Sequence, residues 1–171
     1  MSSMFKRFFL VFIPLIVFSG CSVSYKFNGA SIDYTSVKTV SIQDFPIQAT
    51  LVYAPLSSKF TEGLKDLFIR QTKLKMIKKE GDLQLDGEIV GYDLSPMATK
   101  ADGYASETKL TVTVNVRFIN TKKPEENFEQ RFSAYQTFQA SSMLEDVQDA
   151  LLDAIIKEIS ESIFNKTVAN W

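Results

Sequence analysis

The sequence contains no histidine and only one cysteine among its 171 residues. Histidine is the commonest general base and the commonest metal ligand, so its absence argues against a zinc site and against much of acid–base catalysis. Neither a Ser-His-Asp nor a Cys-His arrangement can be assembled within the chain. A glycine-rich phosphate loop and a nucleophile elbow are also missing. The composition therefore predicts a protein that is not an enzyme and that holds neither a metal nor a cofactor.

The chain also lacks an excess of charge of either sign. It has 19 basic and 20 acidic side chains, which gives a net charge of −1. A nucleic-acid-binding domain would show a strongly basic balance, so we do not expect nucleic acid as a partner. The length corresponds to one ordinary domain that can bury a substantial core.

A long hydrophobic run is missing as well, although the first residues are apolar. Lys6 and Arg7 precede the apolar residues 8–18, which Pro14 interrupts. A membrane-spanning helix needs about 20 apolar residues, so this run is too short to remain as an anchor. The basic start, the apolar centre and the small residues that follow predict a signal peptide over residues 1–20. Its removal takes away two basic side chains and lowers the net charge from −1 to −3.

The single cysteine directly follows the predicted signal peptide. Residues 17–21, Val-Phe-Ser-Gly-Cys, resemble a bacterial lipobox, with Phe18 at the position that usually holds Leu. The resemblance implies that Cys21 becomes the first residue of the mature chain and carries acyl chains such as palmitate. A lone cysteine in an exported protein has no partner for an internal disulfide and would be a reactive liability. The alternative is a plain secretory signal with an incidental cysteine. We expect residues 21–36 to form the lipidated N-terminus and a polar tether.

The rest of the chain, residues 37–171, shows the patterns of one α+β domain. Alternation of apolar and polar residues indicates strands, and apolar residues three and four apart indicate helices. The predicted elements are strands at 37–42, 74–77, 82–94, 109–118 and 126–138, and helices at 55–72 and from 142 onward. We expect a long, mobile connection over 95–106. Each helix has one apolar stripe and each of the better strands has one apolar face. The sequence therefore predicts a four- to five-stranded, mostly antiparallel sheet with two helices packed on one face.

The uncovered face of that sheet is the first candidate binding surface. Alternate residues of a strand point to opposite faces, so the polar partners of the core positions lie there together. Tyrosine and arginine are enriched at protein interfaces. The candidate contacts on this face are Tyr92, Lys109, Arg117, Arg131 and Tyr135. The alternative is an ordinary solvated sheet face.

A second candidate is the basic stretch that follows the first helix. Lys73, Lys75 and Lys78, together with Arg70 and Lys79, raise the local concentration of anions and can contact lipid phosphates. The alternative is a solvated helix end, where basic side chains favour the last carbonyl groups. At the end of the sequence, Trp171 either docks on the domain or on a partner, or belongs to a free tail.

Several of these features together resemble one family. They are the lipobox, the order of elements, the segment 81–89 (Gly-Asp-Leu-Gln-Leu-Asp-Gly-Glu-Ile) that leads to Tyr92 and Pro96, and the tail 163–171. The combination is similar to the lipopolysaccharide-assembly lipoproteins, LptE, and above all to their Bacteroidetes-type members, over essentially the whole mature chain. No motif carries over the family's lipopolysaccharide-contacting basic residues to positions in this sequence.

The resemblance implies a lipoprotein on the periplasmic side of the outer membrane of a Gram-negative bacterium. It further implies that the protein acts as a non-catalytic plug inside a large β-barrel partner, LptD, and helps to deliver lipopolysaccharide to the cell surface. Direct contact with lipopolysaccharide remains open. The alternative function is a lipoprotein that binds a small hydrophobic ligand in a cavity between sheet and helices. An enzyme is a third class.

Overall fold

The computed structural model describes residues 32–51, 53–99 and 105–168. The predicted signal peptide, Cys21, most of the tether and Trp171 lie outside the described residues. The elements in chain order are β1 (Thr39–Ile42), α2 (Pro55–Gln71), β2 (Lys75–Met76), β3 (Leu83–Thr99), β4 (Ala105–Asn120), the short 3-10 helix η1 (Pro124–Glu126), β5 (Phe128–Gln139) and α3 (Leu144–Val168).

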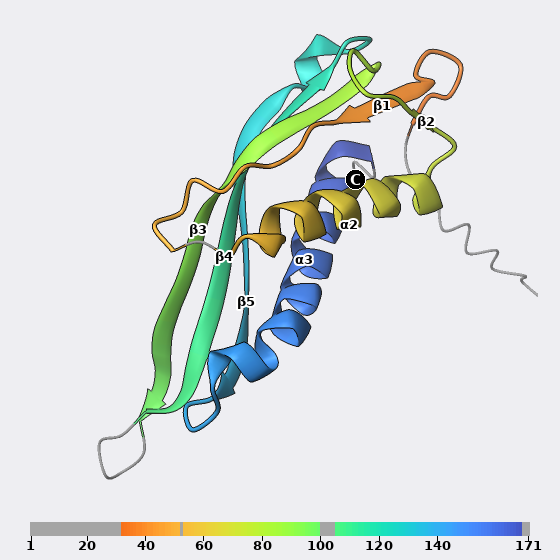
Figure 1. Ribbon diagram of the computed structural model, residues 1–171. Coiled ribbons are helices and arrows are strands. Elements are labelled where there is room, and N and C mark those ends of the chain that lie inside the picture. Colours follow the sequence, from red (N-terminus) through yellow and green to blue (C-terminus); the bar gives the residue numbers. More distant parts are fainter. Residues whose placement is uncertain (1–31, 52, 100–104, 169–171) are drawn as a thin grey trace, which may run out of the picture.

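The five strands form one sheet in the order β2-β1-β3-β4-β5. β3, β4 and β5 are antiparallel neighbours, whereas β1 pairs in parallel with both β2 and β3. α2 and α3 both pack on the same side of this sheet (Figure 1). The predicted α+β class, the mostly antiparallel sheet and the two helices on one face are thus confirmed.

The core lies between the sheet and the two helices. α2 begins with Pro55, whose missing N–H has no partner in the first turn of a helix anyway. Its C-terminal end is fixed by Thr72, whose backbone N–H and hydroxyl both donate to the carbonyl of Phe68, at 3.0 and 2.7 Å. The largest fully buried side chains come from both layers: Phe45, Phe60, Phe68, Phe118, Leu56, Leu64, Leu85, Ile89, Leu110, Leu152, Ile155 and Ile159.

The β3–β4 hairpin is longer than the sequence suggests. We expected a connection over 95–106, but the two strands pair continuously from Leu83↔Asn120 to Thr99↔Ala105. The expected long loop is therefore wrong. Pro96, which lacks a backbone N–H, is tolerated because this part of β3 has only β4 as a neighbour and therefore forms an edge of the sheet. The hairpin extends away from the end of the sheet that holds β1 and β2 (Figure 1).

Candidate functional site

The open face of the sheet is formed by the polar residues of β3, β4 and β5 opposite the helices. In one cross-strand row Asp86 pairs with Arg117, and Arg117 pairs in register with Glu129. Arg117 donates from Nε and Nη2 to the two carboxylate oxygens of Asp86, at 2.9 and 3.0 Å. This two-point geometry is the strongest form of arginine–carboxylate pairing. The hydrogen bonds to Asp86 raise the pKa of Arg117, so the guanidinium stays charged.

The neighbouring rows extend this face along the hairpin. Asn115 donates to Glu129 Oε1 at 2.9 Å and lies in register with Arg131, which is exposed. Further along, the ammonium of Lys109 lies 5.2 Å from the ring centre of Tyr135, whose side chain is 52% exposed. Cation–π contacts of this kind hold an aromatic ring and a charge together at a surface. The strand register thus brings Lys109, Arg117, Arg131 and Tyr135 together on the open face, as the alternation predicts.

Tyr92 does not belong to this face. A β-bulge between Ile89 and Gly91 inserts one extra residue into β3, so the side-chain alternation changes phase. Tyr92 therefore points into the core, is only 5% exposed, and accepts a hydrogen bond from Gln148 Nε2 of α3 at 2.6 Å. Burial raises the pKa of its phenol. The prediction that Tyr92 lies on the open face is wrong, and the structure assigns it to the packing of α3 on the sheet.

The distal part of the β3–β4 hairpin adds apolar surface that sequence reasoning missed. Leu94 and Met97 are 41% and 49% exposed, although both lie within β3. Exposed apolar side chains near charged ones are typical of protein interaction surfaces. Leu94 ends the strand that we expected over 82–94, whereas Met97 lies in the stretch 95–106 that we expected to be a loop, so its exposure on a strand was missed.

The predicted basic stretch lies at a different place, around the edge strand β2. Lys73, Lys75 and Lys78 are all exposed, as is Lys79. Arg70 instead pairs with Asp66 one turn earlier in α2, at 3.7 Å. The structure therefore separates the sequence-predicted contacts into two groups, one on the open face and one at the β2 edge.

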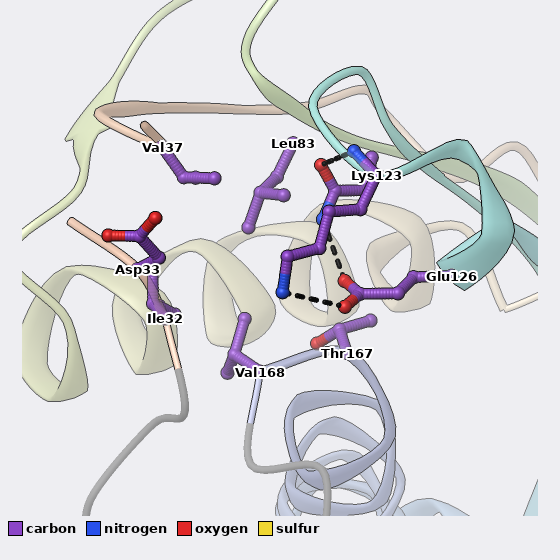
Figure 2. A pocket seen from close by; sticks show the side chains of 9 residues that line it. Ile32, Asp33, Val37, Leu83, Lys123, Glu126, Thr167 and Val168 are labelled. Carbon is purple, nitrogen blue, oxygen red and sulfur yellow. Dashed lines mark hydrogen bonds and ion pairs between the residues drawn. The ribbon is translucent and has the colours of Figure 1, made fainter. Parts of the chain in front are cut away.

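A small polar pocket lies where the beginning and the end of the described chain meet the β4–β5 connection. Ile32, Val37 and Val168 line it together with Lys123 and Glu126 (Figure 2). Lys123 Nζ and Glu126 Oε1 form an ion pair at 3.2 Å. Asn120, which also lines the pocket, donates to Glu126 and accepts from the backbone N–H groups of residues 122 and 123. The polar groups satisfy one another, so they fix the connection rather than await a ligand.

An open groove runs between α2 and α3, with Lys59 beside one end. Lys59 Nζ contacts Asp149 and Asp153 of α3 at 2.9 and 3.3 Å. The groove is lined mainly by charged and polar side chains. Neither this groove nor the polar pocket has the enclosed apolar lining that a small hydrophobic ligand would need.

Within the described residues, no group of three or more acidic, histidine or cysteine side chains is placed to hold a metal ion. No helix in the described ranges is both long enough and apolar enough to cross a membrane.

Comparison with known proteins places this architecture in a family. A family model described as "LptE: Lipopolysaccharide-assembly" matches residues 37–167, which include all five strands and nearly all of α3. The chain belongs to the LptE family. A search of curated proteins gives no match.

Solved structures share the fold of this LptE-family protein at low sequence identity. A minor lipoprotein from Acinetobacter baumannii is 13% identical, with a TM-score of 0.54 over 78% of this chain and 94% of that chain. A hypothetical protein from Chlamydia trachomatis is 12% identical, with a TM-score of 0.52 over 76% and 98% of the two chains. A protein from Xanthomonas campestris is 9% identical, with a TM-score of 0.55 over 78% and 84%. At these identities the similarity concerns the fold alone.

Proposed function

We propose that this LptE-family protein is a non-catalytic, lipid-anchored partner of an LptD-like outer-membrane β-barrel and acts as its plug in lipopolysaccharide transport to the cell surface. The observation that carries the proposal is the family match over residues 37–167. Membership of the family gives the role in lipopolysaccharide assembly. The barrel partner, the plug position and the periplasmic side of the outer membrane are the finer parts of the proposal.

The anchor in this proposal is Cys21. Residues 17–21 resemble a lipobox, and acyl chains contribute about 0.8 kcal/mol per buried CH₂ group. Two or three such chains hold a domain on a membrane without a spanning helix. The domain would then stand on the periplasmic side, next to the end of a barrel in the same membrane.

The docking surface in this proposal is the open sheet face with the distal hairpin. Lys109, Arg117, Arg131 and Tyr135 supply charge and amphipathic area on this face, and the exposed Met97 adds apolar surface on the hairpin. Leu94 is exposed too, but it pairs in register with the core residue Leu110 and therefore lies on the helix side. The Arg117–Asp86 ion pair and the cation–π contact between Lys109 and Tyr135 hold these side chains in place before binding, which lowers the entropy lost on docking. The experiment below also tests whether lipopolysaccharide contacts the same face, because the amounts of barrel protein and of lipopolysaccharide bound to each variant can be measured separately.

The test is a charge reversal on the open face. Arg117→Glu combined with Arg131→Glu should reduce the amount of barrel that co-purifies in mild detergent at least tenfold. Removing one partner of a buried charge pair at an interface typically costs about 2 kcal/mol or more, which corresponds to about thirtyfold in affinity. Lipopolysaccharide retained on the purified protein is quantified in the same samples. Retention of both at the wild-type level would exclude this face.

The control reverses two charges on the helix side, with Arg70→Glu and Lys157→Glu, both of which are exposed. Barrel retention should stay at the wild-type level in this variant. Because Arg117→Glu places a carboxylate beside Asp86, a second test variant, Arg131→Glu with Tyr135→Ser, leaves that ion pair intact. Thermal unfolding of each variant separates a loss of docking from a loss of fold.

A further inference from the structure

The edge of the sheet at β2 carries a group of lysines that the docking surface does not use. This basic edge consists of Lys38, Lys73, Lys75, Lys78 and Lys79, all of which are exposed. None of them forms an ion pair with an acidic side chain in the described part of the chain, whereas the nearby Lys65 is paired with Asp44 at 3.2 Å. The basic edge is therefore a concentration of uncompensated positive charge on a protein whose overall charge is slightly negative.

Backbone hydrogen bonds fix these lysines beside the place where the described chain begins. The N–H of Lys73 donates to the hydroxyl of Tyr34 at 3.4 Å, and Tyr34 lies two residues after the first described residue, Ile32. The N–H of Lys75 donates to the carbonyl of Lys38 at 2.9 Å. The basic edge thus belongs to the same end of the domain as the segment that leads back to Cys21.

The chain length between Cys21 and Ile32 limits how far this end can be from the anchor. A chain from residue 21 to residue 32 spans at most about 36–40 Å when fully extended and on the order of 17–20 Å as a random coil. The opposite end of the domain, the distal β3–β4 hairpin, lies far from β1 and β2 (Figure 1). In the lipid-anchored protein that we propose, the end of the sheet with the basic edge is therefore the one nearer the membrane surface.

We propose that the basic edge docks on the anionic phospholipid headgroups of the membrane that holds the acyl chains of Cys21. The inference rests on the lipid anchor of the proposed function. A lysine close to an anionic lipid surface strengthens association about fivefold, and the effect decays within a Debye length of about 8–10 Å. Several lysines at the end nearest Cys21 therefore hold this end of the domain at the leaflet, beside the barrel in the same membrane. The open face and the β3–β4 hairpin lie outside this contact and stay free to contact the barrel.

A structural role for the same lysines makes a different prediction. Lysine on an exposed edge strand prevents pairing with other chains, and β2 is a short edge strand. In that case substitution of these lysines would promote self-association, and the effect would not depend on the charge of the lipid. The experiment must therefore measure the contact between the lysines and the lipid directly.

The experiment uses the full acylated protein, purified in detergent and incorporated into two kinds of vesicle. One kind contains phosphatidylcholine alone and the other also contains phosphatidylglycerol. Lysine acetylation rates are measured by mass spectrometry for each site. We expect Lys75, Lys78 and Lys79 to react at least threefold more slowly on the anionic vesicles, since each gains contact with headgroup phosphates. Lys157, on the exposed side of α3, should react equally on both, and added salt should remove the protection.

Two matched variants complete the test. Lys78→Gln with Lys79→Gln should weaken the protection of Lys75 on anionic vesicles, while Lys157→Gln with Lys166→Gln should leave it unchanged. Flotation of the protein with the vesicles measures membrane anchoring separately from lysine reactivity. A protein that floats with both kinds of vesicle but shows equal lysine reactivity overturns this inference and leaves the anchor intact. A protein that floats with neither overturns the lipid anchor and this inference together.

Discussion

The carboxylate of Asp82 stabilises the part of the sheet where β1 pairs in parallel with β3. Its Oδ2 accepts hydrogen bonds from the backbone N–H groups of Lys38 and Thr39, at 2.9 and 3.0 Å, and from the Thr39 hydroxyl at 2.9 Å. Its Oδ1 contacts Lys122 Nζ at 3.0 Å, and the side chain is only 19% exposed. One carboxylate thus joins the start of β1, the start of β3 and the β4–β5 connection.

The expected cost of removing this carboxylate follows from these contacts. A hydrogen bond to a charged group contributes about 1.5–3 kcal/mol, and a donor left without a partner costs about 1–3 kcal/mol. Because the contacts share one side chain and are not additive, we expect Asp82→Ala to lower the free energy of unfolding by about 3 kcal/mol. Asp82→Asn keeps an acceptor but loses the charge, so its loss should be about half as large.

The pH dependence gives this prediction a sharper test. The backbone hydrogen bond from Lys38, aided by those from Lys122 and Thr39, lowers the pKa of Asp82 well below its ordinary value of 3.8. The stabilisation is therefore fully present above the unfolded-state pKa and is lost as the pH falls from about 4 towards the folded-state pKa. Denaturant unfolding of the wild type and of Asp82→Asn should show a constant difference between neutral pH and about pH 5, and a shrinking difference below about pH 4.

The control is Asp86→Asn, which removes a carboxylate from the open face. The side chains of Arg117 and Asp86 are 58% and 29% exposed, so the pair is partly screened by solvent and its loss should cost no more than about 1 kcal/mol, less than Asp82→Asn. A difference between wild type and Asp82→Asn that stays the same down to about pH 3 would show that the charge of Asp82 does not stabilise the fold. An equal loss for Asp82→Asn and Asp86→Asn would contradict the prediction as well.

Two further predictions concern β3. Gly87→Ala should lower the free energy of unfolding by about 1–3 kcal/mol or more, because its Cβ would overlap the carbonyl oxygen of Asn115 on β4. Gly91→Ala should lower it less, since its Cβ would meet mainly side-chain atoms at 3.0 Å or more. Equal losses for the two variants in a denaturant titration would contradict this expectation. Tyr92→Phe removes the hydrogen bond from Gln148 and should cost about 0.5–1.5 kcal/mol of stability without changing barrel retention, so a loss of barrel at unchanged stability would return Tyr92 to the docking surface.

Much of the fold could be predicted because its elements are locally consistent. The strict alternation of β4, from Lys109 to Phe118, identifies both of its faces, and the apolar spacing of α2 locates that helix to within one residue. The α+β class follows because each element has a single apolar surface to bury. These features depend on short sequence windows, so a sequence is sufficient to find them.

The misplaced residues depend on information that the sequence does not contain. The bulge between Ile89 and Gly91 shifts the alternation by one residue, and glycine is compatible with either face, so the new position of Tyr92 could not be anticipated. The hairpin beyond Ser95 is polar and has no face that must be buried throughout, so it resembles a loop. Its strands form because β3 and β4 continue a pairing that began in the core.

The candidate surfaces show the same division. The open-face residues of β4 and β5 follow from alternation, but the two-point pairing of Arg117 with Asp86 requires the strand register. The lysines after α2 are evident in the sequence. Their position beside Tyr34, where the described chain begins, depends on the parallel pairing of β1 with β2, which joins segments far apart in the chain.

We propose above that this LptE-family protein works by docking on a β-barrel while acyl chains hold it to the membrane. The most direct measurement is native mass spectrometry of the protein extracted from its own membranes in mild detergent, with the mass of the N-terminal peptide determined from the same sample. We predict one barrel protein several times larger in the complex and fatty acids on Cys21. A monomer without a barrel, with an N-terminus that carries no fatty acid, would contradict the account.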